Sequence, residues 1–145
     1  MPKTWVVVAE SSRAKIFELK KKNTPLKELK DFLHPSSRLH EQQISSDLPG
    51  NTHDNHGYAG HKMTAQTTIK EQESMSFAKT IGQHIEKARS KGEFQQLILM
   101  SPPAFLGQLR KQLSRQTFKR IISEIDKNLV RHTPHDIRAH LPYHF

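Results

Sequence analysis

Two short apolar runs constrain the fold of this chain more than any other feature of its sequence. "WVVVA" (residues 5–9) and "LILM" (residues 97–100) are each bounded by polar residues. Runs of this length are typical of buried strands, and both are far shorter than the roughly 18 apolar residues that cross a bilayer. The chain is therefore expected to fold around a buried sheet and to contain no membrane span.

The N-terminal part of the chain predicts three antiparallel strands. "TWVVVAESSRAKIFEL" reads as strand, short turn, strand, and the serine pair Ser11-Ser12 supplies the turn. "KKKNTP" is a charged bend, and the "LKELKDFLH" segment after it favours a third strand. Its lysines suit the edge of a sheet, where exposed charge prevents aggregation.

Between about residue 35 and residue 66 the composition changes to Ser, Asn, Gly, His and Gln, with only isolated apolar residues. "GNTHDNHGYAGHKMTAQ" forms the second half of this segment. Long segments without a period are functional or disordered when they occur inside a compact domain. We predict one long, flexible loop at about 35–66.

Helical periodicity begins after this loop. Thr68 and Glu71 have the spacing of a capping box, and Gly92 follows as a C-cap, which predicts one amphipathic helix of about twenty residues. The helix would bury Phe77, Ile81, Ile85 and Ala88, which recur at helical spacing.

The last third of the chain predicts strand, helix, strand, helix. "FQQLILMS" is a buried strand, and Pro102-Pro103 ends it and begins a helix. "RIISEIDKNL" is apolar enough for a final strand, and Thr133-Pro134 has the pattern of an N-cap followed by proline at the first helical position. The helix after Pro103 would bury Phe105, Leu106, Leu109 and Leu113.

The resulting order, β-β-β-loop-α-β-α-β-α, predicts an α/β fold in a single domain over residues 1–145. An antiparallel meander followed by two α crossovers gives a mixed five-stranded sheet with helices on its faces, because right-handed crossovers bring later strands parallel to the first. This is the ribonuclease H-like topology. Fold alone does not determine function.

Positive charge is the second constraint on function. The chain carries a formal net charge of +9, and such a surface attracts phosphate backbones or anionic head groups. The densest cluster surrounds the helix after Pro103, and two lysines flank the long loop, so the predicted nucleic-acid-binding residues are Lys62, Lys70, Arg110, Lys111, Arg115, Lys119 and Arg120. An ordinary solvated face is the alternative, and readout of a folded RNA by shape and charge is favoured over base-specific readout.

Other site chemistries receive less support. Two histidine groups, one with Asp54 (His53, His56, His61) and one at the C-terminus (His132, His135, His140, His144), lack a rigid scaffold, so we predict no metal site and no cofactor. Glu10 is the only carboxylate at the end of the first strand, which is too few for a two-metal nuclease. Ser11, Ser12 and Ser101 lack the Gly-x-Ser-x-Gly elbow, and Ser101 is better explained as a helix cap.

Several segments together resemble one bacterial family. "VVVAESSRAKIFEL", "SDLPGNTHDNHG", "KEQESMSFAKTIGQHIEKA", "LILMSPPAFLGQLRKQLS" and "IISEIDKNLVRHTPHDIRAHL" occur in the order seen in the host-attachment protein family, named for a protein required for attachment to host cells. The resemblance covers nearly the whole chain. It also implies a distant kinship with the middle domain of archaeo-eukaryotic release factors and Pelota, and so contact with RNA or the ribosome.

In those release factors the corresponding loop carries Gly-Gly-Gln, which promotes peptidyl-tRNA hydrolysis. Here the loop has Gly57, Gly60 and His61 without that tripeptide, and Asn51 stands where the family tends to have arginine. The loop residues that the resemblance suggests as contacts are Asp47, Pro49, Gly50, Asn51, Asp54, Gly57, Gly60 and His61. Gly60 and His61 are the weak catalytic candidates.

We expect a non-enzymatic, RNA- or ribosome-associated module related to translation. One alternative is an attachment factor that binds a host surface glycan or protein, and a second is a peptidyl-tRNA hydrolase-like activity. The start of the chain lacks the pattern of a secretory signal and the chain contains no cysteine, which favours the cytoplasm. The sequence does not indicate an oligomeric state.

Overall fold

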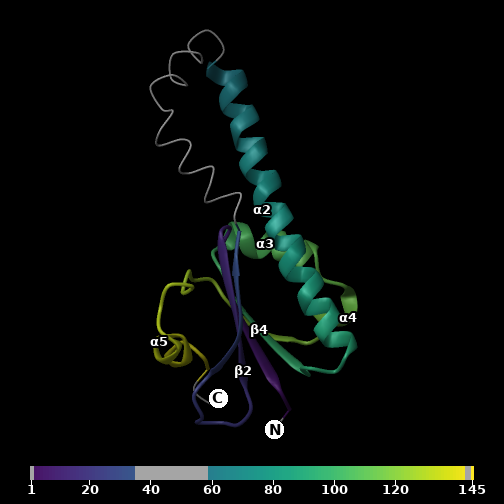
Figure 1. The fold of residues 1–145 in the computed structure, drawn as a ribbon, viewed down its shortest axis with the longest axis vertical. Coiled ribbons are helices and arrows are strands. Elements are labelled where there is room, and N and C mark those ends of the chain that lie inside the picture. The colour runs from purple at the N-terminus through teal and green to yellow at the C-terminus, as the bar shows by residue number, and fades with distance from the viewer. Residues whose placement is uncertain (1, 35–58, 143–144) are drawn as a thin grey trace.

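The computed structural model describes residues 2–34, 59–142 and 145, with the backbone alone for residues 59–68. Within this part of the chain, five strands form one open sheet in the order β3-β2-β1-β4-β5, and the helices cover its faces (Figure 1). The strands are β1 (Thr4–Ala9), β2 (Arg13–Leu19), β3 (Lys27–Leu33), β4 (Gln96–Met100) and β5 (Ile121–Ile125). The helices are α2 (Ala59–Ser90), α3 (Pro103–Lys111), α4 (Arg115–Phe118) and α5 (Pro134–Ala139).

The strand directions confirm the predicted ribonuclease H-like class. β1 pairs antiparallel with β2, and β2 pairs antiparallel with β3, which makes the meander with β3 at the edge. β4 pairs parallel with β1, and β5 pairs parallel with β4, which makes the two crossovers. The carboxyl ends of β1, β4 and β5 therefore lie at the same edge of the sheet.

Strand β1 is buried on both faces, as its uninterrupted apolar run predicts. Trp5 and Val7 face the cluster under α2 and α3, whereas Val6 and Val8 face the cluster under α5 and the C-terminal segment. The three valines have no exposed surface, and fully burying a side chain of this size stabilises the fold by about 1.5–3 kcal/mol. Strand β1 therefore gives a rigid support to the residues that follow its carboxyl end.

Two predicted boundaries before residue 70 are wrong. Helix α2 begins at Ala59, so residues 59–66 are helical and do not belong to the predicted loop at 35–66, whose other residues, 35–58, lie outside the described residues. Thr68 lies inside the helix and is not its N-cap. The physical reason is that propagating an existing helix costs little, so "KMTAQTT", which contains no proline, continues α2 through a capping pattern that could have started one.

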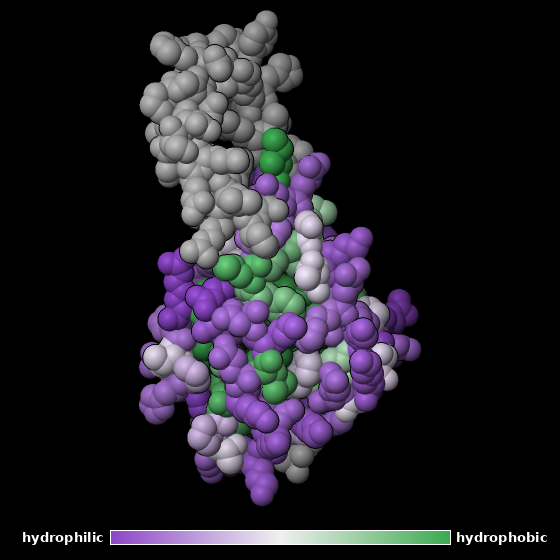
Figure 2. Space-filling view, viewed as in Figure 1, coloured by the Kyte–Doolittle hydropathy of each residue, from purple (hydrophilic) through white to green (hydrophobic). Residues whose placement is uncertain are grey.

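Helix α2 extends well beyond the sheet. Its 32 residues span about 48 Å at 1.5 Å per residue, and its N-terminal half projects past the sheet in Figure 1. The side chains that enter the core come from its C-terminal half, and they are the four predicted ones together with Ala78. Figure 2 shows that the face viewed is mostly hydrophilic, with apolar residues gathered near the base of the projecting part.

Helix ends and one close approach fix the remaining elements. Gly92 adopts a φ of 72° just after α2, which confirms the predicted C-cap. Thr133 accepts a hydrogen bond from the Asp136 backbone N–H at 3.1 Å, which confirms the predicted N-cap of α5. Where α2 meets the end of α3, a Cβ atom added to Gly82 would lie 2.7 Å from the Cβ of Gln112, so only glycine allows this approach.

Candidate nucleic-acid interface

Helix α4 organises the predicted basic cluster. It is a single turn between α3 and β5, at the side of the molecule marked in Figure 1. The hydroxyl of Ser114 caps it by accepting a hydrogen bond from the Thr117 backbone N–H at 3.2 Å. An isolated turn of this length is unstable in water, so α4 depends on contacts with the rest of the protein.

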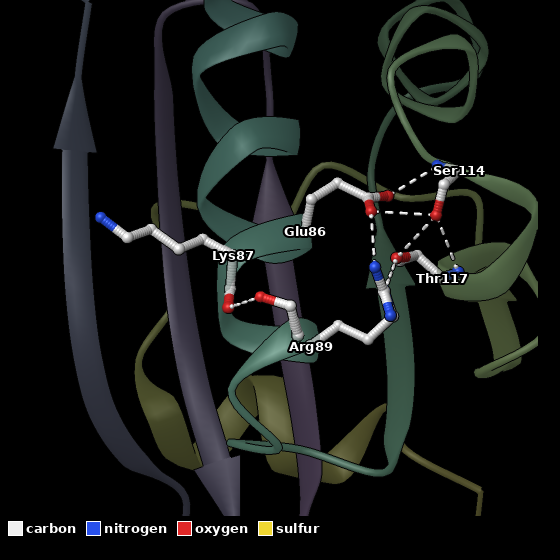
Figure 3. A network of polar contacts seen from close by, with 6 residues as sticks. Glu86, Lys87, Arg89, Ser114 and Thr117 are labelled. Carbon is white, nitrogen blue, oxygen red and sulfur yellow. Dashed lines mark hydrogen bonds and ion pairs between the residues drawn. The ribbon is translucent and has the colours of Figure 1, made fainter.

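A polar network anchors α4 to the C-terminal half of α2 (Figure 3). The carboxylate of Glu86 accepts hydrogen bonds from the backbone N–H of Ser114 at 2.6 Å and from its hydroxyl at 2.9 Å. Arg89 donates from Nε to the hydroxyl of Thr117 at 2.7 Å and also contacts Glu86 at 3.4 Å. Thr117 is fully buried, so its hydroxyl needs this partner.

The same network sets the ionisation of Glu86. Burial raises the pKa of this carboxyl, but hydrogen bonds from the Ser114 backbone, from the hydroxyls of Thr117 and Ser114 and from Arg89 together lower the pKa below its ordinary value. Glu86 is therefore ionised at neutral pH. Its negative charge accepts the hydrogen bonds that hold α4 and is balanced by Arg89. Glu86 therefore repels a bound anion only weakly.

The cations around α4 are exposed and uncompensated. In the sequence no Asp or Glu occurs between Glu93 and Glu124. Four of the predicted residues are exposed and form no ion pair within the described part of the chain, namely Lys111, Arg115, Lys119 and Arg120. We call these four residues the α4 basic surface. Such a surface can bind an anionic chain by displacing its counterions.

Arg110 was predicted as part of this cluster, but its charge is already balanced. Its Nε donates to Glu124 of β5 at 2.7 Å, and its Nη2 contacts the other carboxylate oxygen. The hydrogen bond and charge of Glu124 raise the pKa of Arg110 above its ordinary value. This pair ties α3 to β5, and Arg110 contributes less to the attraction of an anion than its four neighbours.

An exposed aromatic residue lies among these cations, and sequence reasoning missed it. Phe118 is 48% exposed. It follows Arg115 by three positions, so the two side chains are neighbours on the surface of α4, and Lys119 comes directly after it. No sequence signal marks its exposure, because a helical turn as short as α4 shows no period. Exposed aromatic rings stack on unpaired bases.

The two predicted lysines of α2 do not join this surface. Lys70 is exposed and precedes Glu86 by sixteen positions, which separates them by about 24 Å along the helix axis. Lys62 lies two turns further from Glu86 on the projecting half of α2. The predicted binding residues therefore form two separate groups.

The predicted loop contacts are only partly described. Gly60 and His61 lie in the first turn of α2. The other predicted loop residues lie outside the described residues, and these are Asp47, Pro49, Gly50, Asn51, Asp54 and Gly57. His53, His56 and His144 also lie outside the described residues.

The remaining histidines do not assemble a metal centre in the part of the chain that the structure describes. No group of three or more potential ligands occurs there. The His132 and His140 rings contact each other edge to face at 6.5 Å, and His132 lies 3.8 Å from the Asp136 carboxylate. His135 is exposed on α5.

The serines considered for nucleophilic chemistry have other roles. The hydroxyl of Ser12 donates to Glu10 at 2.6 Å. Ser101 is fully buried after β4, and its hydroxyl donates to the carbonyl of Pro102 at 3.3 Å. The predicted role of Ser101 as a helix cap is wrong, because Pro102 is the N-cap of α3 and no side chain caps it. Ser11 is exposed in the β1–β2 turn. Across residues 2–34 and 59–142 no helix is both long and apolar enough to span a membrane.

The fold and this surface define a basic, single-sheet α/β protein with a ribonuclease H-like strand order. The chain belongs to the family described as "Protein required for attachment to host cells", whose sequence profile matches residues 5–141. This confirms the resemblance seen in the sequence.

Two further similarities are more distant. An uncharacterized protein of Rickettsia prowazekii (strain Madrid E) is 26% identical over 96 residues, which cover 65% of this chain and 64% of that protein. The crystal structure of an archaeal translation termination factor is similar with a TM-score of 0.49 and 17% identity, over 84% of this chain and 29% of that one.

Proposed function

We propose that this protein is a non-enzymatic module that binds RNA, in free form or in the ribosome, through the α4 basic surface. The observation that carries the proposal is the set of four exposed cations without ion-pair partners in the described chain, arranged around one anchored helical turn. A surface that is already ordered loses little conformational entropy when it binds.

Phe118 makes unpaired RNA a better fit than a plain polyanion. Its ring is exposed beside Arg115 and Lys119, so phosphates can contact the cations while a base stacks on the ring. Stacking of this kind contributes about 1–3 kcal/mol per base. Binding would thus combine charge with one aromatic contact, without base-specific hydrogen bonds.

A second candidate follows from family membership. The family description refers to attachment to host cells, and a sulfated host glycan is a polyanion that the same four cations could bind. A glycan has no aromatic base, so Phe118 would contribute little to that interaction. Phe118 therefore discriminates between the two candidates.

The test is fluorescence anisotropy with a labelled single-stranded RNA of about 12 nucleotides, a length within the roughly 4–16 nucleotides that one small single-strand-binding domain contacts. The variant replaces Lys111, Arg115, Lys119 and Arg120 by glutamine. The matched control replaces four cations in the β2–β3 turn and at the start of β3 by glutamine, and these are Lys20, Lys21, Lys22 and Lys27.

The proposal predicts a large loss of RNA affinity in the α4 variant and little change in the control. Phe118→Ala is expected to weaken RNA binding about tenfold and to leave binding of a sulfated glycan unchanged. Equal losses in both charge variants would show that only net charge matters and would refute a dedicated surface. Binding of the glycan but not of RNA would favour attachment.

We further propose a cytoplasmic location, where an RNA-binding protein would meet its partner. Sedimentation of a cell lysate through a sucrose gradient tests both points, because a ribosome-associated protein sediments with ribosomal particles at low salt and leaves them as salt rises. Surface labelling of intact cells that recovers the protein would contradict the cytoplasmic location.

A further inference from the structure

A second site lies at the opposite end of α3 from α4. A cavity of about 430 Å³ opens between α2 and α3, where the carboxyl ends of three neighbouring parallel strands meet. Glu10 follows β1, Pro102 follows β4 and Asn128 follows β5, and all three line the cavity. In open α/β sheets ligands bind outside the carboxyl ends of strands, and a volume of roughly 300–1,000 Å³ suits a small molecule.

The walls of this cavity differ in chemistry. Pro102, Ala104 and Phe105 form an apolar wall from the start of α3. Lys70 of α2 and Gln108 of α3 add polar groups on either side. An apolar wall with a few polar groups directed at one space is the usual composition of a small-molecule site.

Glu10 is held in place as a hydrogen-bond acceptor. Its two carboxylate oxygens accept hydrogen bonds from the Ser12 hydroxyl at 2.6 Å and from the Asn128 side-chain amide at 2.8 Å. Each carboxylate oxygen has a second lone pair, so Glu10 can still accept N–H groups of a ligand. Gln108 accepts a hydrogen bond from Ser74 through Oε1, which leaves its amide N–H groups as donors.

We propose that this cavity binds a nucleoside monophosphate, with the base edge on Glu10, the base plane against the Pro102–Phe105 wall and the phosphate toward Lys70. The N–H groups of a base pair well with a carboxylate acceptor. The planar ring suits the apolar wall, and the ammonium of Lys70 suits a phosphate. The nucleotide is either free or the terminal residue of an RNA strand.

Glu71 provides an internal control. It also lines the cavity, beside Lys70, but no hydrogen bond or ion pair within the described chain holds its side chain. Its charge opposes a phosphate at Lys70. Glu10 and Glu71 can each be changed to glutamine with almost no change in shape, and the proposal predicts different results for the two.

The experiment is calorimetric titration of the full chain with the four nucleoside monophosphates, their nucleosides and inorganic phosphate. Glu10→Gln is expected to weaken binding of the preferred nucleotide at least about tenfold, since a hydrogen bond to a charged group is lost. Glu71→Gln is expected to leave affinity equal or raise it a few-fold. Lys70→Gln is expected to weaken the nucleotide but not its nucleoside.

Several outcomes overturn the proposal. These are the absence of binding by every nucleotide, binding of inorganic phosphate as tight as that of the nucleotide, or an equal loss in both glutamate variants. If Glu10→Gln does not fold, amide shift mapping of the parent protein decides, because the proposal requires nucleotide-induced shifts at Ser11, Lys70 and Gln108. Shifts confined to α4 would contradict it.

The proposals for the cavity and for the α4 basic surface can be refuted independently. The α4 charge variant is expected to bind nucleotides like the parent, and Glu10→Gln is expected to bind internal RNA segments like the parent. RNA with a 5′-phosphorylated end is compared with RNA whose end is unphosphorylated. If the cavity binds the terminal residue of a strand, Glu10→Gln weakens binding of the phosphorylated RNA. If it binds only a free nucleotide, Glu10→Gln leaves RNA binding unchanged.

Discussion

Removing the Glu86 carboxylate should release α4 from α2. Glu86→Ala removes the acceptor for two hydrogen bonds from Ser114 and the partner of Arg89. One hydrogen bond to a charged group contributes about 1.5–3 kcal/mol, and losing its partner costs less where the group left behind can rehydrate. Ser114 is exposed and the Glu86 side chain is 24% exposed, so we expect a loss near the lower part of this range, about 2 kcal/mol.

Urea and thermal unfolding followed by circular dichroism measure this loss. For a chain of this size about 2 kcal/mol corresponds to a fall in Tm of roughly 6 °C. Glu71→Ala, on the same helix but with an exposed side chain, is the matched control and should stay within about 0.5 kcal/mol of the parent.

A double-mutant cycle with Ser114→Ala isolates the contact between Glu86 and the Ser114 hydroxyl, because the backbone N–H of residue 114 remains a donor. Residues that share a hydrogen bond should show a coupling free energy of about 0.5 kcal/mol or more. Additive effects would show that the hydroxyl contact adds no stability, and if Glu86→Ala is no less stable than the Glu71 control, the anchoring role of the network is refuted.

The same variant carries a pH signature. The pKa of Glu86 is lower in the folded protein than its ordinary value of 4.5, so the folded state binds fewer protons at this site than the unfolded state. The stability it contributes is fully present above the unfolded pKa and is lost as pH falls through the lowered folded pKa. The stability difference between parent and Glu86→Ala should therefore shrink below about pH 4.5, and a constant difference would contradict this cause.

Four further substitutions test the packing. Gly82→Ala should destabilise the protein by about 1–3 kcal/mol, because its Cβ would clash with Gln112. Gly107→Ala in α3, where nothing lies within 4 Å of an added Cβ, should stabilise it by up to about 1 kcal/mol. Urea unfolding that ranks the two variants the other way would refute the close approach at Gly82. Thr133→Ala should cost about 1 kcal/mol through loss of the α5 cap, and a value near zero would show that the 3.1 Å contact to Asp136 adds no stability. Phe118→Ala should leave Tm unchanged, because its ring is half exposed, and a large fall would assign it to the core.

The fold could be predicted because its signals are local. The apolar run at residues 5–9 marks the central strand, and Pro103 and Thr133 mark helix starts through their own backbone preferences. The start of α2 was mispredicted because two local signals conflict there. A capping pattern at Thr68 competes with helix-compatible residues before it, and the structure continues the helix.

The site could be predicted only in part, because its defining contacts join distant positions. The Arg110–Glu124 pair spans fourteen positions, and the Glu86–Ser114 contacts span twenty-eight. No periodicity indicates such pairs. A single helical turn such as α4 is also too short to show a period, so Phe118 could not be assigned to the surface from sequence.

Salt dependence of RNA binding tests the central claim most directly. Each phosphate contact on single-stranded nucleic acid contributes about 0.7 to the slope of log Kd against log salt concentration, so four contacts give about 3. The account predicts that neutralising Lys111, Arg115, Lys119 and Arg120 lowers the slope by about this amount, whereas neutralising the β2–β3 turn leaves it unchanged. An equal slope in the parent and the α4 variant would contradict the α4 basic surface as the RNA-binding site.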